Sequence, residues 1–92
     1  EDGPAVEYPN VEKYWYVNGQ LHREDGPAIE NVNGEKHWCL NGKYHREDGP
    51  AVEYPDGEKH WYLNGKSVSW QEVFKQAKTQ EQEVRVLCYV AI

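Results

Sequence analysis

The fold of this chain is decided by one stretch of 23 residues, EDGPAIENVNGEKHWCLNGKYHR, which occupies positions 24–46. Near-copies of this stretch fill 1–23 and 47–69, and eleven of the 23 positions are identical in all three copies. A unit this short cannot bury its own apolar side chains, so it must stack on its neighbours. The sequence therefore predicts an elongated array of three tandem repeats rather than a globule around a pocket.

Turn residues divide each copy into short extended segments. Asp-Gly and Asn-Gly supply the positive φ angles that tight turns require, and β-branched and aromatic residues lie between them. First strands are expected at 4–8, 27–31 and 50–54, and aromatic second strands at 13–17, 36–40 and 59–63. Each copy therefore predicts a β-hairpin, and successive hairpins should form a mainly β, twisted antiparallel sheet.

Alternation along the second strands assigns their side chains to two faces. The expected core face carries three tryptophans with three aliphatic neighbours: Trp15, Trp38 and Trp61, with Val6, Ile29 and Val52. The opposite face is aromatic but amphipathic, and it offers candidate anchors for a protein partner. These anchors are Tyr14, Tyr16, His37, His60 and Tyr62.

The sequence departs from the repeat after Lys66. Ser69 followed by Glu72 matches a capping box, and apolar residues at helical spacing predict an amphipathic helix over about 70–79. The run 84–92 is dense in β-branched residues and predicts a strand. The chain is thus divided into a repeat array at 1–66 and a cap at 67–92.

Two roles are open for the strand expected at 84–92. It could pair with the last hairpin and cover the end of the array, as terminal repeats generally require. Alternatively, an apolar edge strand could pair with a second copy and give a homodimer. The dimer contact would then involve Val84, Val86, Cys88 and Val90.

Charge narrows the choice of partner. The chain has 16 acidic and ten basic residues, a formal charge of -6, so it should repel nucleic-acid phosphates and anionic membranes. A protein with a basic surface is the natural complement. Six glutamates could form acidic lines along the array that imitate nucleic acid, or a solvated surface paired with Lys13, Lys36 and Lys59. These glutamates are Glu7, Glu30 and Glu53, and Glu12, Glu35 and Glu58.

Candidate catalytic groups do not converge. Cys39 and Cys88 have no paired spacing, which favours free thiols in a reducing compartment such as the cytoplasm. Equivalent histidines on successive hairpins would lie about 10 Å apart, too far to share a metal ion. We expect no enzyme, metal or cofactor, and we expect His22, His45, Arg23 and Arg46 to bond turn carboxylates and carbonyls.

Two segments resemble a known repeat family. WCLNGKYH at 38–45, followed by EDG at 47–49, resembles the MORN repeat, and LHREDGPA at 21–28 resembles its divergent variant in bacterial, bacteriophage and giant-virus proteins. The resemblance covers about 1–66 and implies a row of hairpins with a groove, used for protein interaction, oligomerisation or lipid contact. Arg23 and Arg46 depart from the motif, which usually has glycine there.

Together, the resemblance and the charge predict a non-catalytic interaction protein. Its most concrete form is a bacteriophage-encoded inhibitor, such as an anti-CRISPR protein, that docks on a host defence or nucleic-acid-processing protein. The alternative is a structural module that dimerises through its C-terminal strand. In either case we expect a cytoplasmic protein.

Overall fold

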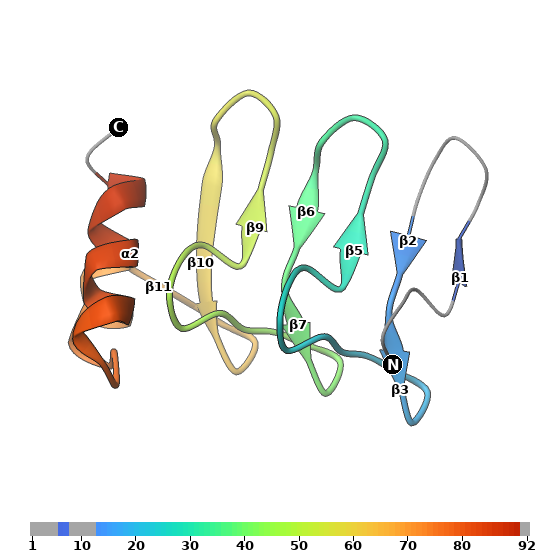
Figure 1. Ribbon diagram of the computed structural model, residues 1–92, viewed down its shortest axis with the longest axis horizontal. Coiled ribbons are helices and arrows are strands. Elements are labelled where there is room, and N and C mark those ends of the chain that lie inside the picture. The colour runs from blue at the N-terminus through green and yellow to red at the C-terminus, as the bar shows by residue number, and fades with distance from the viewer. Residues whose placement is uncertain (1–5, 8–12, 91–92) are drawn as a thin grey trace.

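The computed structural model describes residues 6–7 and 13–90. Over these residues the chain is mainly β, with antiparallel strands followed by two C-terminal helices (Figure 1). The main sheet has the order β1-β2-β5-β6-β9-β10-β11. Its strands are β1 (Val6–Glu7), β2 (Lys13–Tyr14), β5 (Ile29–Glu30), β6 (Lys36–His37), β9 (Val52–Glu53), β10 (Lys59–Leu63) and β11 (Lys66–Val68).

Two smaller hairpins extend the second strands of the first two copies. They pair β3 (Tyr16–Val17) with β4 (Gln20–Leu21), and β7 (Cys39–Leu40) with β8 (Lys43–Tyr44). Their Asn-Gly turns have positive φ at both central residues, 52° at Asn18 and 78° at Gly19. This is the turn type that matches strand twist, so the expected role of Asn-Gly is confirmed.

Each of the first two tryptophans interrupts its strand. Trp15 lies between β2 and β3, and its backbone N–H donates to the carbonyl of Ala28 (2.9 Å). Trp38 lies between β6 and β7 and donates in the same way to Ala51 (2.6 Å). We call the segments that supply these carbonyls the first corner (residues 23–28) and the second corner (residues 46–51). Trp61 instead lies inside the uninterrupted β10 and pairs with Val68.

Strand register corrects the predicted faces. Ile29 lies opposite Tyr14 and His37, and Val52 lies opposite His37 and His60. Directly opposed residues share a face, so the aliphatic residues accompany the Tyr and His rings rather than the tryptophans. Val6 likewise pairs with Tyr14. The prediction was wrong because alternation within one strand does not determine its register with the next.

The core of the described residues is small and spread along the array. Its buried apolar members are Trp15, Ala28, Cys39, Ala51, Val52, Val73 and Val86. The last two come from the C-terminal helices, so the cap contributes part of the core. Five residues of the expected first strand and turn (8–12) lie outside the described residues, as do 1–5 and 91–92.

The first C-terminal helix begins where the sequence predicts. α1 (Trp70–Lys75) is capped by Ser69, whose side-chain oxygen accepts the backbone N–H of Glu72 (3.3 Å). It ends at Lys75, before the predicted end near residue 79.

The strand predicted at 84–92 is wrong, because the described part of this segment belongs to helix α2 (Gln80–Val90). Thr79 caps the start of the helix, because its hydroxyl accepts the backbone N–H of Gln82 (3.1 Å). Val86 is fully buried, and Arg85 pairs with Glu81 one turn earlier (3.0 Å). Tertiary packing and these local contacts outweigh the β preference of the valines. No helix in the described ranges has the length and apolar character that crossing a membrane requires.

Candidate interaction groove

One arginine organises the first corner. The guanidinium carbon of Arg23 lies 3.9 Å from the ring centroid of Trp15. Its Nε donates to Asp25 Oδ1 (3.1 Å), and its Nη1 donates to the carbonyl of Pro27 and to Glu30 Oε2 (both 3.2 Å). These bonds confirm the expectation that the corner arginine bonds turn carboxylates and carbonyls. They also tie the corner to the preceding tryptophan and the following strand.

Arg46 repeats this arrangement in the second corner. Its guanidinium carbon lies 3.7 Å from the Trp38 ring, and its Nε donates to Asp48 Oδ1 (3.0 Å). Nη1 donates to the carbonyl of Pro50 (3.1 Å) and to Glu53 Oε2 (2.9 Å). The internal scaffold of the two corners is therefore the same.

Glycine is required where each guanidinium crosses the backbone. A Cβ at Gly26 would lie 2.8 Å from Arg23 Cζ, and a Cβ at Gly49 would lie 2.7 Å from Arg46 Cζ. The Gly49 position is further confined, because the same Cβ would meet Tyr89 Cε2 at 2.8 Å. The Asp-Gly pair thus serves arginine packing in addition to turning the chain.

The histidine that precedes each corner forms a hydrogen bond with the next hairpin. His22 Nδ1 accepts the backbone N–H of Asn41 (2.9 Å), and its Nε2 lies 3.3 Å from Glu24 Oε2. An accepting Nδ1 leaves the proton of the neutral ring on Nε2, which then donates to the carboxylate. His45 has the same partners one copy later, Asn64 at 2.9 Å and Glu47 at 3.2 Å.

The two corners differ in what covers their carboxylates. At the second corner, Lys78 Nζ donates to Glu47 Oε2 (3.3 Å) and Arg85 Nη1 donates to Asp48 Oδ2 (3.1 Å). Tyr89 of α2 accepts a hydrogen bond from Arg46 Nη2 (2.8 Å). The Glu47 and Asp48 side chains are consequently 34% and 25% exposed.

The equivalent carboxylates of the first corner are open to solvent. The side chains of Glu24 and Asp25 are 82% and 89% exposed, although they keep their bonds to His22 and Arg23. Within the described residues, Asp25 Oδ2 has no partner, whereas the corresponding Asp48 Oδ2 binds Arg85. The two corners have the same sequence, but their two acids are exposed in the first corner and covered by the cap in the second.

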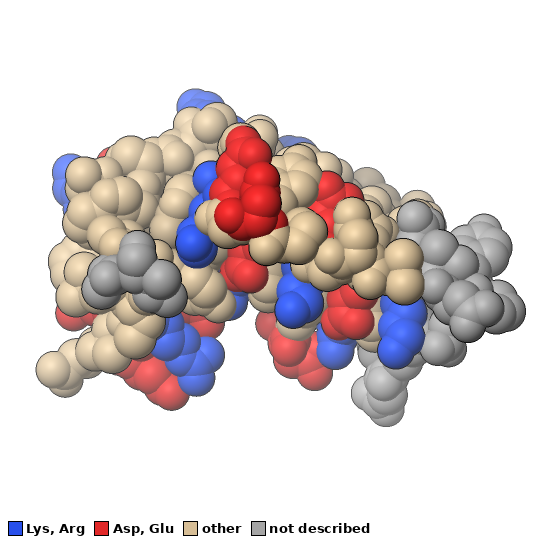
Figure 2. All heavy atoms as spheres, turned by 90° about the horizontal axis from the view of Figure 1, so that it is seen from above, with Lys and Arg blue, Asp and Glu red and all other residues tan. Residues whose placement is uncertain are grey.

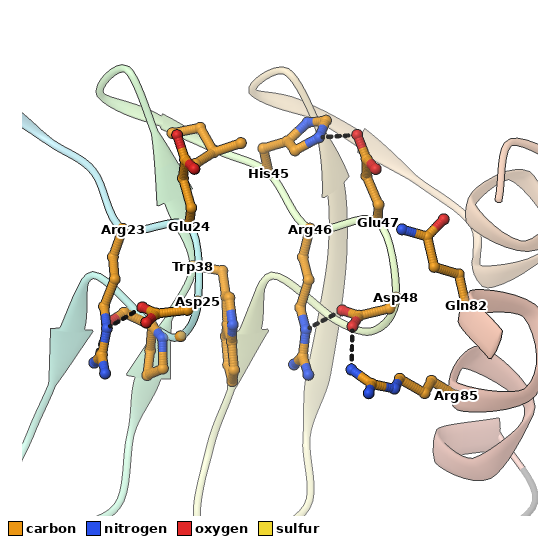
Figure 3. Close-up of a pocket in the computed structure, with 13 residues that line it drawn as sticks. Arg23, Glu24, Asp25, Trp38, His45, Arg46, Glu47, Asp48, Gln82 and Arg85 are labelled. Atoms are coloured by element: carbon orange, nitrogen blue, oxygen red, sulfur yellow. Dashed lines mark hydrogen bonds and ion pairs between the residues drawn. The ribbon is translucent and has the colours of Figure 1, made fainter. Parts of the chain in front are cut away.

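A groove of about 710 Å³ lies beside the first corner. One wall is 23–27, the floor contains Trp38, Arg46 and Asp48, and the other wall is formed by Gln82 and Arg85 of α2 (Figure 3). The surface is hollowed between α2 and the middle of the sheet, with acidic and basic side chains close together on both sides (Figure 2). The groove is thus a mixed-charge site whose solvated acids belong to the first corner.

Hydrogen bonding from the cap alters the titration of the second corner. Burial raises the pKa of the Glu47 carboxyl, but hydrogen bonds from His45 and Lys78 lower it by more, so the net value lies below the ordinary 4.5. Hydrogen bonding to Asp48, with the nearby charge of Glu81, raises the pKa of the Arg85 guanidinium. Both shifts favour the charged forms that hold α2 against the corner.

The predicted aromatic anchors pack against other aromatic rings of the sheet. His37 contacts the rings of Tyr44 (5.6 Å) and Tyr54 (6.5 Å), and Tyr54 in turn contacts His60 (5.7 Å). Two further contacts join Tyr44 to Tyr62 (5.1 Å) and Tyr14 to Tyr16 (6.5 Å). Of the predicted anchors only Tyr16 is exposed, and the others are half-buried. The sequence analysis missed Tyr44 and Tyr54, although both flank the tight turns.

The predicted acidic lines are interrupted by cations. Glu30 and Glu53 are ion-paired with Arg23 and Arg46, and their strand partners are lysines. Glu35 accepts a hydrogen bond from Asn31, and Glu58 lies 3.0 Å from His60 Nε2. Glu12 lies outside the described residues, as does the side chain of Glu7. Among the ion-paired acids described, those of the first corner are the most open.

The four residues predicted for dimerisation divide between two environments. Val86 is fully buried and Val90 is half-buried, whereas Val84 and Cys88 are exposed. Leu87 is also exposed and lies one turn from Val84, a neighbour that a strand interpretation could not identify. The helix therefore replaces the expected edge strand with a short apolar stripe.

Of the two cysteines, Cys39 is buried and Cys88 is exposed. Burial raises the pKa of the Cys39 thiol to about 11, so it stays protonated and shielded near neutral pH. Across 13–90 and 6–7, no group of three or more His, Cys, Asp or Glu residues is placed to hold a metal ion.

Neither a protein-family model, nor a curated protein, nor a solved structure matches this chain. The MORN resemblance of residues 1–66 therefore remains a hypothesis. Function has to be argued from the two corners and the groove between the first corner and α2.

Proposed function

We propose that this chain is a non-catalytic protein-interaction module, formed by three tandem hairpin repeats and a helical cap, which binds the basic surface of a partner protein. The observation that carries the proposal is the contrast between the two corners. Glu47 and Asp48 bind Lys78 and Arg85 of the cap, while the same pair in the first corner is solvated beside a groove. The first corner thus presents two solvated carboxylates with the chemistry to bind a cationic group.

Charge supports a basic partner. The formal charge of -6 attracts cationic surfaces over about one Debye length, roughly 8 Å at physiological ionic strength. Pairing at the groove would then contribute specificity more than affinity. An inhibitor of a host defence or nucleic-acid-processing protein fits this behaviour, because such proteins present basic channels for nucleic acid.

The proposal is tested by capture from a bacterial lysate at low and high salt. The test variant is Glu24→Gln with Asp25→Asn, which removes two charges at the groove while keeping oxygen acceptors for His22 and Arg23. The matched control is Asp56→Asn with Glu58→Gln, two exposed acids in a hairpin turn. Asn33 already fulfils the role of Asp56 in the preceding copy, accepting the N–H of Glu35 (3.0 Å) as Asp56 accepts that of Glu58 (2.9 Å).

The proposed interaction module is supported if wild type and the control variant capture a partner at low salt, and if this capture is lost at high salt and in the groove variant. An equal loss of the partner in the two variants would show that net charge alone is responsible. Both variants should give the circular-dichroism spectrum of wild type, since neither removes a hydrogen-bond acceptor.

Self-association is a second candidate, favoured by the exposed stripe Val84, Leu87 and Cys88 on α2. Burying such a stripe between two helices would remove apolar surface from water. Light scattering of Val84→Lys, compared with the exposed Gln80→Lys on the same helix, is the test. A dimeric mass lost only in Val84→Lys supports this candidate, and a monomeric wild type eliminates it.

A further inference from the structure

We infer that the groove beside the first corner receives an arginine side chain of the partner protein, bound by Asp25. The inference rests on the proposed function and names the group that the interaction module recognises. Its template is inside the molecule, where Arg85 of α2 binds the equivalent carboxylate of the second corner.

The atoms used in the template are open in the first corner. Asp48 binds Arg46 with Oδ1 and Arg85 with Oδ2, whereas Asp25 binds Arg23 with Oδ1 and has Oδ2 free among the described residues. Arg46 Nη2 donates to Tyr89, whereas Arg23 Nη2 has no partner in the same part of the chain. Both open atoms belong to residues that line the groove.

Arginine fits this groove better than lysine. A planar guanidinium carries its donors in a fixed fork, so it can bond the Asp25 carboxylate while its face lies over an aromatic ring. Guanidinium carbons already lie 3.9 Å from the Trp15 ring centroid and 3.7 Å from that of Trp38, and Trp38 also lines the groove. An ammonium group is a compact point charge without this planar match.

No arginine of this sequence is free to be the occupant. The sequence contains three arginines, and each is already engaged with carboxylates: Arg23 and Arg46 within their corners, Arg85 with Asp48 and Glu81. A second copy could supply Arg85 only by breaking its ion pairs with Glu81 on the same helix and with Asp48, the pair that joins its cap to the second corner. A partner with a free arginine on its surface meets no such cost.

The fold also restricts how that arginine arrives. α2, the second corner and the first corner follow one another along the long axis of the molecule (Figure 1). The second corner therefore occupies, next to the first corner, the position that α2 occupies next to the second. A helix cannot pack against the first corner in the same way. The partner's arginine must extend into the groove from a segment lying outside it.

Nuclear magnetic resonance titration of the isotopically labelled chain tests the inference with two probes, an acetylated and amidated tetra-arginine peptide and its tetra-lysine equivalent. We expect tetra-arginine to shift the backbone amide signals of residues 24–26 and the indole N–H signal of Trp38. Asp25→Asn should weaken this binding about five- to tenfold, because the neutral amide oxygen accepts a hydrogen bond about half as strong as that of the carboxylate. Asp56→Asn, which removes an equal charge elsewhere, should weaken it less than about twofold.

Three results would overturn the inference: equal binding of both peptides, equal effects of the two substitutions, or shifts confined to other residues. If lysate capture depends on Glu24 and Asp25 while the peptides bind equally, the interaction module stands and the arginine preference fails. If capture is also independent of these residues, the proposed function fails as well.

Discussion

The first and second corners contain the same residues and differ in their surroundings. In both, an arginine lies on a tryptophan and binds an aspartate, a proline carbonyl and a glutamate. Only the second is covered by the cap, in which Arg85 and Tyr89 of α2 bind Asp48 and Arg46, and Lys78, just before α2, binds Glu47. The repeat therefore determines the internal scaffold, while the neighbouring segment determines whether the same acids support the fold or remain open for a partner.

The largest expected difference between the corners comes from removing their arginines. Arg46→Ala should lower the free energy of unfolding by about 3 kcal/mol, because it removes the donors to Asp48 Oδ1, Glu53 and the Tyr89 hydroxyl. Arg23→Ala should cost about 2 kcal/mol, since its carboxylates are better solvated. Urea unfolding followed by tryptophan fluorescence measures both values, and equal losses would show that the contact with Tyr89 adds nothing.

The next largest difference in stability between the corners should come from replacing a glycine with alanine, which adds one methyl group. Gly49→Ala places a Cβ against Arg46 and the Tyr89 ring, and we expect a cost of about 2 kcal/mol from overpacking. Gly26→Ala meets only the flexible end of Arg23 at its closest contacts and should cost about 1 kcal/mol. The ordering is checked by thermal unfolding of the two variants. A greater loss at Gly26 would contradict the tighter packing of the second corner.

Removing a single hydroxyl tests the contact between cap and corner. Tyr89→Phe deletes the acceptor for Arg46 Nη2 and keeps the ring against Trp61, so about 1 kcal/mol should be lost. Tyr16→Phe, at an exposed tyrosine, should change stability by less than about 0.5 kcal/mol. Chemical denaturation gives both numbers. If the two changes are alike, the hydroxyl of Tyr89 does not stabilise the cap.

Acid should loosen the second corner through Glu47. Its pKa is below the ordinary 4.5 in the folded chain, so its contribution is fully present above about pH 4.5 and is lost as the pH falls through the lower folded value. The side chain is one-third exposed, so the effect should be only a few tenths of a kcal/mol. Stability measured from pH 6 to 3 should decline less in Glu47→Gln than in wild type, with Glu24→Gln as matched control. Parallel curves for Glu47→Gln and wild type would refute this role.

Local chemistry was predictable from the sequence. The Asn-Gly turns, the Ser69 cap and the bonds of Arg23 and Arg46 follow from the conformational and hydrogen-bonding preferences of those residues. Each depends on atoms a few residues apart, so a single chain is enough to infer it. The arginines that depart from the MORN motif are also explained, because each one joins a corner to its tryptophan.

Features that depend on distant segments were not predictable in the same way. The register that places Val52 opposite His37 depends on turn length, and α2 forms where its valines alone favour a strand. Thr79 and Gln82 match a capping-box spacing, a signal hidden in a segment that looks like a polar connection. The groove could not be inferred either, since its far wall belongs to α2.

The bonds of each corner have a consequence for valency. Those of the first corner reach back to Trp15 and forward to Glu30 and Asn41, all within about one copy in either direction, whereas the cap binds the acids of the second corner alone. A chain lengthened by one more copy of residues 24–46 would keep one covered corner and gain one open corner. Such a chain would present two equivalent contact points on one rigid sheet, and a partner with two suitably spaced arginines would gain avidity without any new type of contact.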